Sequence, residues 1–462
     1  MVIKDDRDNW MEQVVKEQSV IKSVIDRNIS GFQWRVILLC FAIALFDGFD
    51  TQAVAFTAPA LLEHFNLKAG ALAPILTAGI IGMTIGAMCL GILGDKLGRR
   101  KTLLFCVTIF SVSTLLTAFV NHVDQIFILR IIAGLGMGGA TPVLLALAAE
   151  YSPQKYKGTV TTCVLLALPA GAMIGGLLAA KILPIWGWQG IYLIGGILPL
   201  LLLVLLYFAL PESLEYLAQS KKSNAKQKIE AVLERMTTKK VTISDRDLAL
   251  LSPVRTEKMH LSMLFQNGLG RTTIGVWGVY FFNWIAWFML LSWLPTILKQ
   301  AGLAPDQAPY ASVTVNAAFI LFALPLAYFL PKLNTAKILA FMVVVGLGVV
   351  VGLGSLIETQ QWTYIFLLIA LAGFGVGGQQ LALNYLVVDA YPASVRATAT
   401  GWAIGMGRFG AIIGSAIGGI ILSEFGVSGY FYALGVPLIV ALICIVLIKD
   451  QKRKIDQHIT AH

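Results

Sequence analysis

Gly94-Asp95-Lys96-Leu97-Gly98-Arg99-Arg100-Lys101 is a short basic stretch between two long apolar runs. The runs on either side of it, 72–94 and 101–120, each have about the length that an α-helix needs to cross a hydrocarbon core of about 30 Å. The glycines in the stretch allow a turn short enough to join two such helices. The pattern predicts two membrane-spanning helices joined by a tight basic loop.

Similar apolar runs recur along the whole chain, which is 57% hydrophobic and only 13% charged and has a mean hydropathy of +0.77. This composition excludes an ordinary water-soluble protein. Because the runs are long and continuous rather than alternating, they favour helices over barrel strands. We predict an all-α membrane protein of twelve transmembrane helices over residues 36–60, 72–94, 101–120, 125–150, 159–181, 189–210, 272–298, 307–330, 336–357, 361–388, 397–423 and 426–448.

The net charge of +10 is distributed unevenly between the two faces of this arrangement. With both termini in the cytoplasm, the loops and ends on that side carry 30 of the 35 Lys and Arg residues. This asymmetry fixes the orientation by the positive-inside rule and accounts for the charge without a nucleic-acid partner. Residues 1–35 have no apolar core of a signal peptide, so we expect the first span to be an uncleaved anchor.

An internal repeat divides the chain into two six-helix halves. At an offset of 239 residues, Gly134–Gly139 matches Gly373–Gly378, and earlier in each half an offset of 236 pairs Asp47 with Asn283. Six spans separate the copies, so both copies have the same membrane orientation and a central cavity is expected between them. The predicted parts are a cytoplasmic segment 1–35, a bundle 36–210, a cytoplasmic linker 211–271 with amphipathic stretches such as 226–236, a second bundle 272–448 and a tail 449–462.

Two acidic residues, Asp47 and Asp50, lie deep inside the first predicted span. They are 11 to 14 residues from its start, which is about 17–21 Å at ~1.5 Å per residue and hence near the bilayer centre. Burial and mutual repulsion favour protonation of such carboxylates, so one of them is a candidate proton carrier. A structural ion pair is the alternative.

Arg408 lies near the middle of the eleventh span, where its repeat counterpart is Pro169. A guanidinium that faces a cavity suits a carboxylate substrate through two parallel hydrogen bonds, whereas the alternative is a fixed salt bridge to Asp47 or Asp50. Both arrangements are compatible with one transport cycle, and we predict a substrate-binding role for Arg408 together with Asp50.

Aromatic and amide side chains gather in the seventh and tenth spans. Tyr280 and Trp284 belong to an aromatic segment that suits a flat ring, although packing between helices explains it equally well. The uncharged hydrogen-bonding groups are suited to ring hydroxyls or to bonds between helices, and they are Asn283, Gln379, Gln380 and Asn384.

Charged residues at the inner helix ends are candidates for gates. Glu150 with Lys157 stands at the position that matches Asp389 with Arg396 in the second half. Each pair either closes a gate or is an ordinary helix-end charge. In the basic stretch, Asp95 can pair with a base or a helix N-terminus and so favour one conformation. The further gating candidates are Arg99 and Arg100.

Cofactor chemistry has no support in the sequence. The five cysteines fall within spans without metal-ligand spacing, and none of the five histidines lies in a span. The glycine-rich runs lie inside apolar helices and not after strands, so close helix packing is favoured over nucleotide binding. We predict no cofactor, no metal and no enzymatic activity.

These motifs resemble the aromatic acid:H+ symporter family of the major facilitator superfamily. The resemblance rests on Asp-Gly-Phe-Asp-Thr at 47–51, the stretch at 94–100, Leu-Ser-Trp-Leu-Pro-Thr at 291–296, Tyr-Pro-x3-Arg-Ala-Thr at 391–398 and Gly-Met-Gly-Arg-Phe-Gly at 405–410. It implies import of small aromatic carboxylates such as hydroxybenzoate, protocatechuate, benzoate or vanillate with protons, by alternating access across a bacterial inner membrane. The matching positions are Asp47, Asp50, Asp95, Arg130, Glu150, Arg396 and Arg408.

In this resemblance Arg130, whose repeat counterpart is Ile369, takes a role in proton movement or gating, with a capping role near the outer interface as the alternative. The loop 331–337 departs from the family because it has no acid. The rival functions are a carrier of aliphatic organic acids such as muconate, a sugar or polyol porter and, in a different class, a membrane chemoreceptor for aromatic acids. We expect a monomer in the lipid bilayer.

Overall fold

The computed structural model describes residues 20–220, 224–237, 239–251, 261–266 and 268–448. The segment 1–19 and the predicted tail 449–462 lie outside the described residues. Ten helices of the described part are long and apolar enough to cross a membrane, and two of them, α7 and α16, each contain two helices joined at a kink. The predicted all-α fold with twelve crossings is therefore confirmed.

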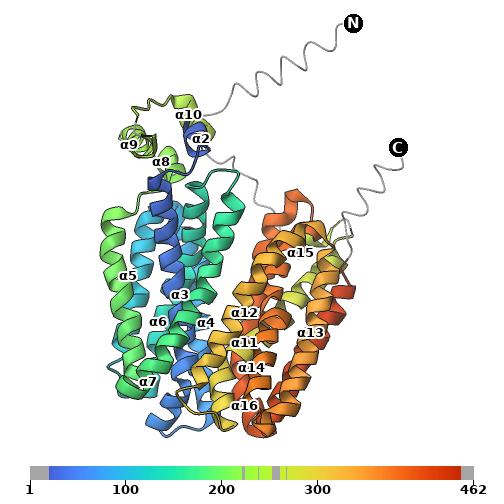
Figure 1. Ribbon diagram of the computed structural model, residues 1–462. Coiled ribbons are helices and arrows are strands. Elements are labelled where there is room, and N and C mark those ends of the chain that lie inside the picture. Colours follow the sequence, from blue (N-terminus) through green and yellow to red (C-terminus); the bar gives the residue numbers. More distant parts are fainter. Residues whose placement is uncertain (1–19, 221–223, 238, 252–260, 267, 449–462) are drawn as a thin grey trace.

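Two sets of helices form the two halves of the molecule (Figure 1). The N-terminal half consists of α3 (Gly31–His64), α4 (Leu72–Leu97), α5 (Arg99–Thr117), α6 (Val123–Glu150) and α7 (Lys157–Ala209). The C-terminal half consists of α11 (Gly270–Gln300), α12 (Ala308–Phe329), α13 (Thr335–Leu356), α14 (Trp362–Ala372), the π-helix η5 (Gly373–Gly377), α15 (Gln379–Ala390) and α16 (Ala393–Val446).

The kinks in α7 and α16 confirm the internal repeat at the level of the backbone. Gly187 has φ 63° and ψ −167°, and Gly426 has φ 67° and ψ −170°. This left-handed region is open to glycine without a steric cost, and the two glycines are 239 residues apart. Each kink reverses the chain in a turn of about one residue.

Close helix packing also follows the repeat. A Cβ atom on Gly171 would lie 1.8 Å from the carbonyl oxygen of Leu45, and one on Gly410 would lie 2.2 Å from that of Phe281. Glycine is therefore required where α7 crosses α3 and where α16 crosses α11. The prediction that the glycine runs serve helix packing agrees with these contacts.

The two halves touch each other near one end of the molecule. Lys299 of α11 forms an ion pair with Glu63 of α3, and Gln52 Nε2 donates to the carbonyl oxygen of Leu291 over 3.5 Å. The ribbons of the two halves separate toward the opposite end, which carries the helices of the linker (Figure 1).

The linker between the halves forms short helices that pack on the N-terminal half (Figure 1). In α9 (Ala225–Thr237) one face buries Ile229 and Leu233, as the predicted amphipathic stretch requires. The backbone N–H of Val20 donates to Asp247 over 2.8 Å and so connects the N-terminal segment with the linker. The other helices of this region are α2 (Val20–Ile25), α8 (Leu214–Gln219) and α10 (Asp245–Leu251). The 3-10 helix η2 (Leu261–Phe265) packs instead on α11 and α16 of the C-terminal half.

Candidate functional site

Asp50 and Arg130 form a fully buried ion pair inside the N-terminal half. Arg130 Nη1 lies 3.0 Å from Asp50 Oδ2 and 3.2 Å from Asp50 Oδ1, and the side chains are 1% and 0% exposed. Thr114 Oγ1 donates to Asp50 Oδ1 over 2.7 Å. The carboxylate of the first span therefore meets α5 and α6 within one hydrogen-bonded cluster.

Three further contacts hold the guanidinium of Arg130. Its Nη2 donates to Thr114 Oγ1 over 3.0 Å and to Thr117 Oγ1 over 3.1 Å. Its Cζ lies 5.1 Å from the ring centroid of Tyr192, whose hydroxyl is 2.9 Å from that of Thr57. These are contacts of a deeply buried cation, not of a helix cap near the interface. We call Asp50, Arg130, Thr114, Thr117 and Tyr192 the charged cluster.

Asp47 lies on the same helix as Asp50 and is also buried, but it has different partners. Thr141 Oγ1 donates to Asp47 Oδ2 over 2.9 Å, and Thr51 Oγ1 lies 3.4 Å from Asp47 Oδ1. Its carboxylate is also within electrostatic range of Asp50 and of Arg408. The two acids that the sequence groups together are thus held by separate sets of hydroxyl donors.

Arg408 is half-buried on α16 and interacts electrostatically with Asp47 across the boundary between the halves. Among the described residues it has no hydrogen bond and no ion pair. The fixed salt bridge that was the alternative at this position is therefore absent from this structure. Its neighbour in the chain, Gly407, packs against the ring of Trp284 on α11.

The amides predicted as binding groups form one hydrogen-bonded cluster, with Asn283 at its centre. Asn283 Nδ2 donates to Gln379 Oε1 over 2.6 Å, and Gln380 Nε2 donates to Asn283 Oδ1 over 2.7 Å. Gln379 also donates to the carbonyl oxygen of Gly375 within η5. A single π-helical turn frequently accompanies a functional site. Asn384 lies one turn further on, is exposed, and reaches only the carbonyl oxygen of Gln380, over 3.4 Å.

Three aromatic residues of α11 carry buried polar atoms that have no partner among the described residues. These atoms are Nε1 of Trp277, the hydroxyl of Tyr280 and Nε1 of Trp284. Buried donors of this kind are rare, because each costs about 1–3 kcal/mol when it is unsatisfied. Tyr280 and Trp284 therefore keep hydrogen-bonding capacity for a molecule other than the protein.

The first predicted gate is built around Glu150. Arg99 forms ion pairs with Glu150 and with Glu215 of α8, the second at 2.8 Å. Glu150 also accepts from Ser213 Oγ over 3.2 Å and from the backbone N–H of Glu215 over 2.6 Å. Lys157, the partner expected from the sequence, is not paired with Glu150 in the described part of the chain. Glu150 faces the basic stretch and the linker instead.

The basic stretch itself is held from the linker side. The backbone N–H of Arg100 donates to Glu212 Oε1 over 3.0 Å, so a carboxylate caps the N-terminus of α5. Arg100 also donates to the carbonyl oxygen of Tyr207. Asp95 is exposed and has no hydrogen bond or ion pair to any described residue.

The matching inner end of the C-terminal half is less charged. Thr335 Oγ1 donates to Asp389 Oδ2 over 2.6 Å, and Arg396 donates to the carbonyl oxygen of Tyr391 over 3.4 Å. Asn334 caps α13 by accepting from the N–H of Lys337 over 3.0 Å. The loop without an acid thus supplies its own amide cap.

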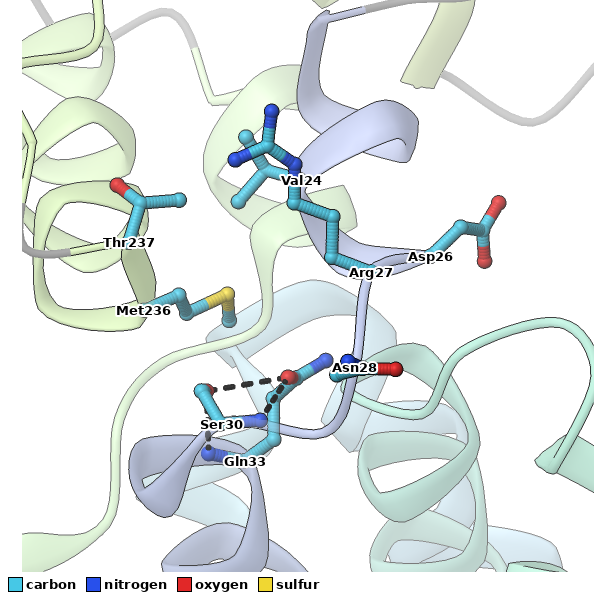
Figure 2. A pocket seen from close by; sticks show the side chains of 8 residues that line it. All are labelled: Val24, Asp26, Arg27, Asn28, Ser30, Gln33, Met236 and Thr237. Carbon is cyan, nitrogen blue, oxygen red and sulfur yellow. Dashed lines mark hydrogen bonds between the residues drawn. The ribbon is translucent and has the colours of Figure 1, made fainter.

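A separate cavity of about 530 Å³ opens at the linker end of the N-terminal half (Figure 2). It shares no residue with the predicted site and is lined by Val24, Asp26, Arg27, Asn28, Ser30, Gln33, Met236 and Thr237. No group of three or more potential metal ligands occurs within the described residues.

Several members of these clusters were missed by the sequence analysis. Thr114 and Thr117 are two of several hydroxyl residues in their span, and nothing in the spans of these residues or of Tyr192 marks their partner. The repeat could have identified Thr141, because at the offset of 239 it is the counterpart of Gln380, which is a predicted binding residue. Glu212 lies in the linker, where charged residues are common.

A twelve-helix fold of two repeated halves, with a few charged groups buried among its apolar helices, is typical of a membrane carrier. The family model "Major Facilitator Superfamily" matches residues 40–353 and 276–460, and the chain belongs to this superfamily. Its members are transporters, so the prediction that the protein is a membrane-spanning carrier and not an enzyme is confirmed.

Several curated transporters are similar to the chain over most of its length. The gallate transporter of Pseudomonas putida is 34% identical over 92% of this chain and 94% of the relative, and the 4-hydroxybenzoate transporter of Pseudomonas aeruginosa is 32% identical over 85% and 87%. The benzoate transport protein of Acinetobacter baylyi is 29% identical over 95% and 94%. The predicted resemblance to aromatic acid transporters is confirmed.

Solved structures show the same fold. A crystal structure of a D-xylose-proton symporter aligns with a TM-score of 0.69 over 91% of this chain and 99% of that one, at 21% identity. At this identity the likeness supports the fold alone.

Proposed function

We propose that the protein imports small aromatic carboxylates together with protons by alternating access between its two halves. The observation that carries this proposal is Arg408, a half-buried guanidinium that has no acceptor among the described residues, one position after Gly407, which packs on the aromatic ring of Trp284. A carboxylate on a flat ring satisfies both groups at once, the first by charge-assisted hydrogen bonds and the second by stacking. A sugar has no charge that could pair with this cation.

The relatives support the substrate class. Those named for gallate, 4-hydroxybenzoate and benzoate share a carboxylate on a benzene ring and differ in their hydroxyl groups. In this chain Arg408 binds the carboxylate, while Tyr280, Trp284 and the amides Asn283, Gln379, Gln380 and Asn384 surround the ring. Asp47 lies within electrostatic range of Arg408 and competes with the substrate for it.

Protons enter through the charged cluster. Asp50 is the proton carrier, because it is the buried acid whose counter-ion, Arg130, lies in the same half and compensates its charge when the proton leaves. Asp47 senses the substrate through Arg408. The inward proton gradient then drives uptake of an anion.

The gates lie at the end that carries the linker. We place this end in the cytoplasm of a bacterium, with both chain termini there, because it also carries most of the basic residues. Arg99, Arg100, Glu150 and Asp95 control it in the N-terminal half, and Asp389 and Arg396 do so in the C-terminal half. The two halves are separated at the end that carries the linker, which corresponds to an inward-facing state. The chain works as a monomer in the inner membrane.

Uptake of radiolabelled 4-hydroxybenzoate into proteoliposomes tests the proposal. An imposed inward proton gradient is expected to drive accumulation by the wild-type protein. Arg408→Ala is expected to weaken substrate affinity by about 30- to 1,000-fold, which corresponds to about 2–4 kcal/mol for a lost charge pair. Arg271→Ala, which changes an exposed arginine near the linker, is the matched control. Unchanged affinity in the Arg408 variant would exclude this residue as the carboxylate clamp.

A further inference from the structure

Thr114 and Thr117 lie side by side on α5 and have no sequence motif that assigns them a role. Both are fully buried, and both accept a hydrogen bond from the same atom, Nη2 of Arg130. Thr114 additionally donates to Asp50, whereas Thr117 donates to the carbonyl oxygen of Ser113 in its own helix over 2.8 Å. Thr117 thus turns only the negative end of its hydroxyl dipole toward the ion pair.

The repeat shows that these hydroxyls are not needed for packing. At the offset of 236 residues, the counterparts of Thr114 and Thr117 are Val350 and Leu353, which are 1% and 0% exposed on α13. The same helix positions in the same fold are therefore filled by apolar side chains. The two hydroxyls occur in the half that has a buried arginine to bind.

We propose that Thr117, supported by Thr114, is a positioning residue for proton coupling: it holds Arg130 in place when Asp50 takes up a proton. This inference rests on the proposed proton-coupled function. While Asp50 is ionised, the Asp50–Arg130 pair is neutral overall and a neighbouring dipole interacts with it only weakly. When Asp50 is protonated, the cluster has a net positive charge, and an oxygen aimed at the guanidinium stabilises it strongly.

The proton balance of the step is simple. A proton from the outer water forms an O–H bond on the Asp50 carboxylate, and no other covalent bond changes. Arg130 loses its charged acceptor but keeps the two threonine oxygens and the ring of Tyr192. The guanidinium therefore stays in the N-terminal half and does not move toward the substrate.

The titratable groups around Asp50 come from three helices. The titratable and charged groups that face Asp50 are Asp47 from its own helix, Arg130 from α6 and Tyr192 from α7. The side chains of α5 that contact the pair, Thr114 and Thr117, do not titrate. Removing the Thr117 hydroxyl therefore changes a dipole and leaves the number of charges constant.

The test uses the purified full-length protein in proteoliposomes with radiolabelled 4-hydroxybenzoate. Uptake driven by a pH gradient is measured against external pH, and exchange of labelled for unlabelled substrate is measured without a gradient. Thr117→Val is expected to move the half-maximal pH of uptake to lower pH by about 0.5–1 unit, because protonation of Asp50 becomes less favourable. Exchange, which needs no net proton release, is expected to stay within about two-fold of wild type.

Two controls make the result specific. Thr117→Ser keeps the hydroxyl and is expected to restore the wild-type pH profile. Ser111→Ala removes another buried hydroxyl of α5, one that bonds only within its own helix, and is expected to leave the profile unchanged. Should Thr117→Val fail to express, Thr117→Leu carries the residue found at its counterpart.

The outcomes separate the inference from the proposed function. A wild-type protein that shows no uptake in response to the pH gradient contradicts the proposed proton coupling itself. A coupled wild-type protein with an unshifted Thr117→Val profile overturns the role of Thr117 alone. Equal loss of uptake and exchange in Thr117→Val also overturns it, because that result indicates a structural role.

Discussion

The two halves share one backbone but fill the same interior positions with opposite chemistry. In the N-terminal half the charged cluster consists of Asp50, Arg130, Thr114, Thr117 and Tyr192. At the repeat offsets the C-terminal half has side chains that are at most 1% exposed and wholly apolar, namely Ala286, Ile369, Val350, Leu353 and Phe431.

This comparison separates what the fold requires from what function requires. A six-helix half folds with an apolar interior, so a buried ion pair is not a condition for the architecture. Desolvating two charges commonly costs as much as their attraction returns. The ion pair of the N-terminal half is therefore best understood as a functional element placed in a scaffold that is stable without it.

The largest expected effect comes from making the N-terminal half resemble its partner. Asp50→Ala leaves Arg130 buried without a counter-ion and is expected to destabilise the protein by about 3–5 kcal/mol. The double variant Asp50→Ala/Arg130→Ile, which carries both residues of the other half, is expected to recover a thermal unfolding midpoint near that of wild type. Neither variant is expected to accumulate substrate uphill. A double variant no more stable than the single one would show that the pair itself stabilises the fold.

A second change makes the C-terminal half resemble the first. Asn283→Asp places a carboxylate at the counterpart of Asp47, within the amide cluster that we propose to surround the substrate ring. Repulsion of the anionic substrate is expected to weaken its binding by about 10- to 100-fold, or about 1.4–2.8 kcal/mol. Equilibrium binding measures the loss, and the uncharged amide of the same aromatic acid is the control ligand. An equal loss for both ligands would assign the effect to the disrupted amide cluster.

A smaller effect is expected at the inner ends. Arg99 and Glu150 form an ion pair in the N-terminal half. At the repeat offsets their counterparts are Thr335 and Asp389, which form a hydrogen bond in the C-terminal half. Arg99→Thr copies the second arrangement into the first. Because Glu150 keeps Ser213 and the N–H of Glu215, a loss of about 1–2 kcal/mol is expected. Thermal unfolding measures it, and Arg99→Lys is the charge-preserving control.

The smallest effect is expected at the hydrogen-bonded inner end of the C-terminal half. Thr335→Val removes the donor to Asp389 and is expected to cost about 1 kcal/mol in unfolding experiments, with uptake nearly unchanged. A cost larger than that of Arg99→Thr would show that the hydrogen bond at this end of the C-terminal half stabilises the protein more than the corresponding ion pair of the N-terminal half.

The sequence predicted the architecture because hydropathy and internal repetition act over whole spans. These two signals predicted the twelve crossings and the two matching halves, and they also revealed the rare charges inside the spans. Each deep charge is conspicuous against an apolar background, so Asp47, Asp50, Arg130 and Arg408 could be found without coordinates.

The sequence did not predict which charged residues pair with each other, because the pairing depends on how each helix is rotated about its axis. An all-apolar helix has no amphipathic pattern that fixes this rotation. Asp50 thus pairs with Arg130 and not with Arg408, and Glu150 with Arg99 and not with Lys157. The threonines of α5 escaped notice for a similar reason, since one hydroxyl hardly changes the hydropathy of a span.

The one-residue turns at Gly187 and Gly426 leave no spare chain between the helices that they join. Because no flexible loop separates the two helices of such a hairpin, a tilt of the first helix also tilts the second. We therefore expect the last two crossings of each half to move together. A short Gly/Ser insertion at either turn would loosen that coupling and slow the alternation of the two faces, while every side chain of the interior remained in place.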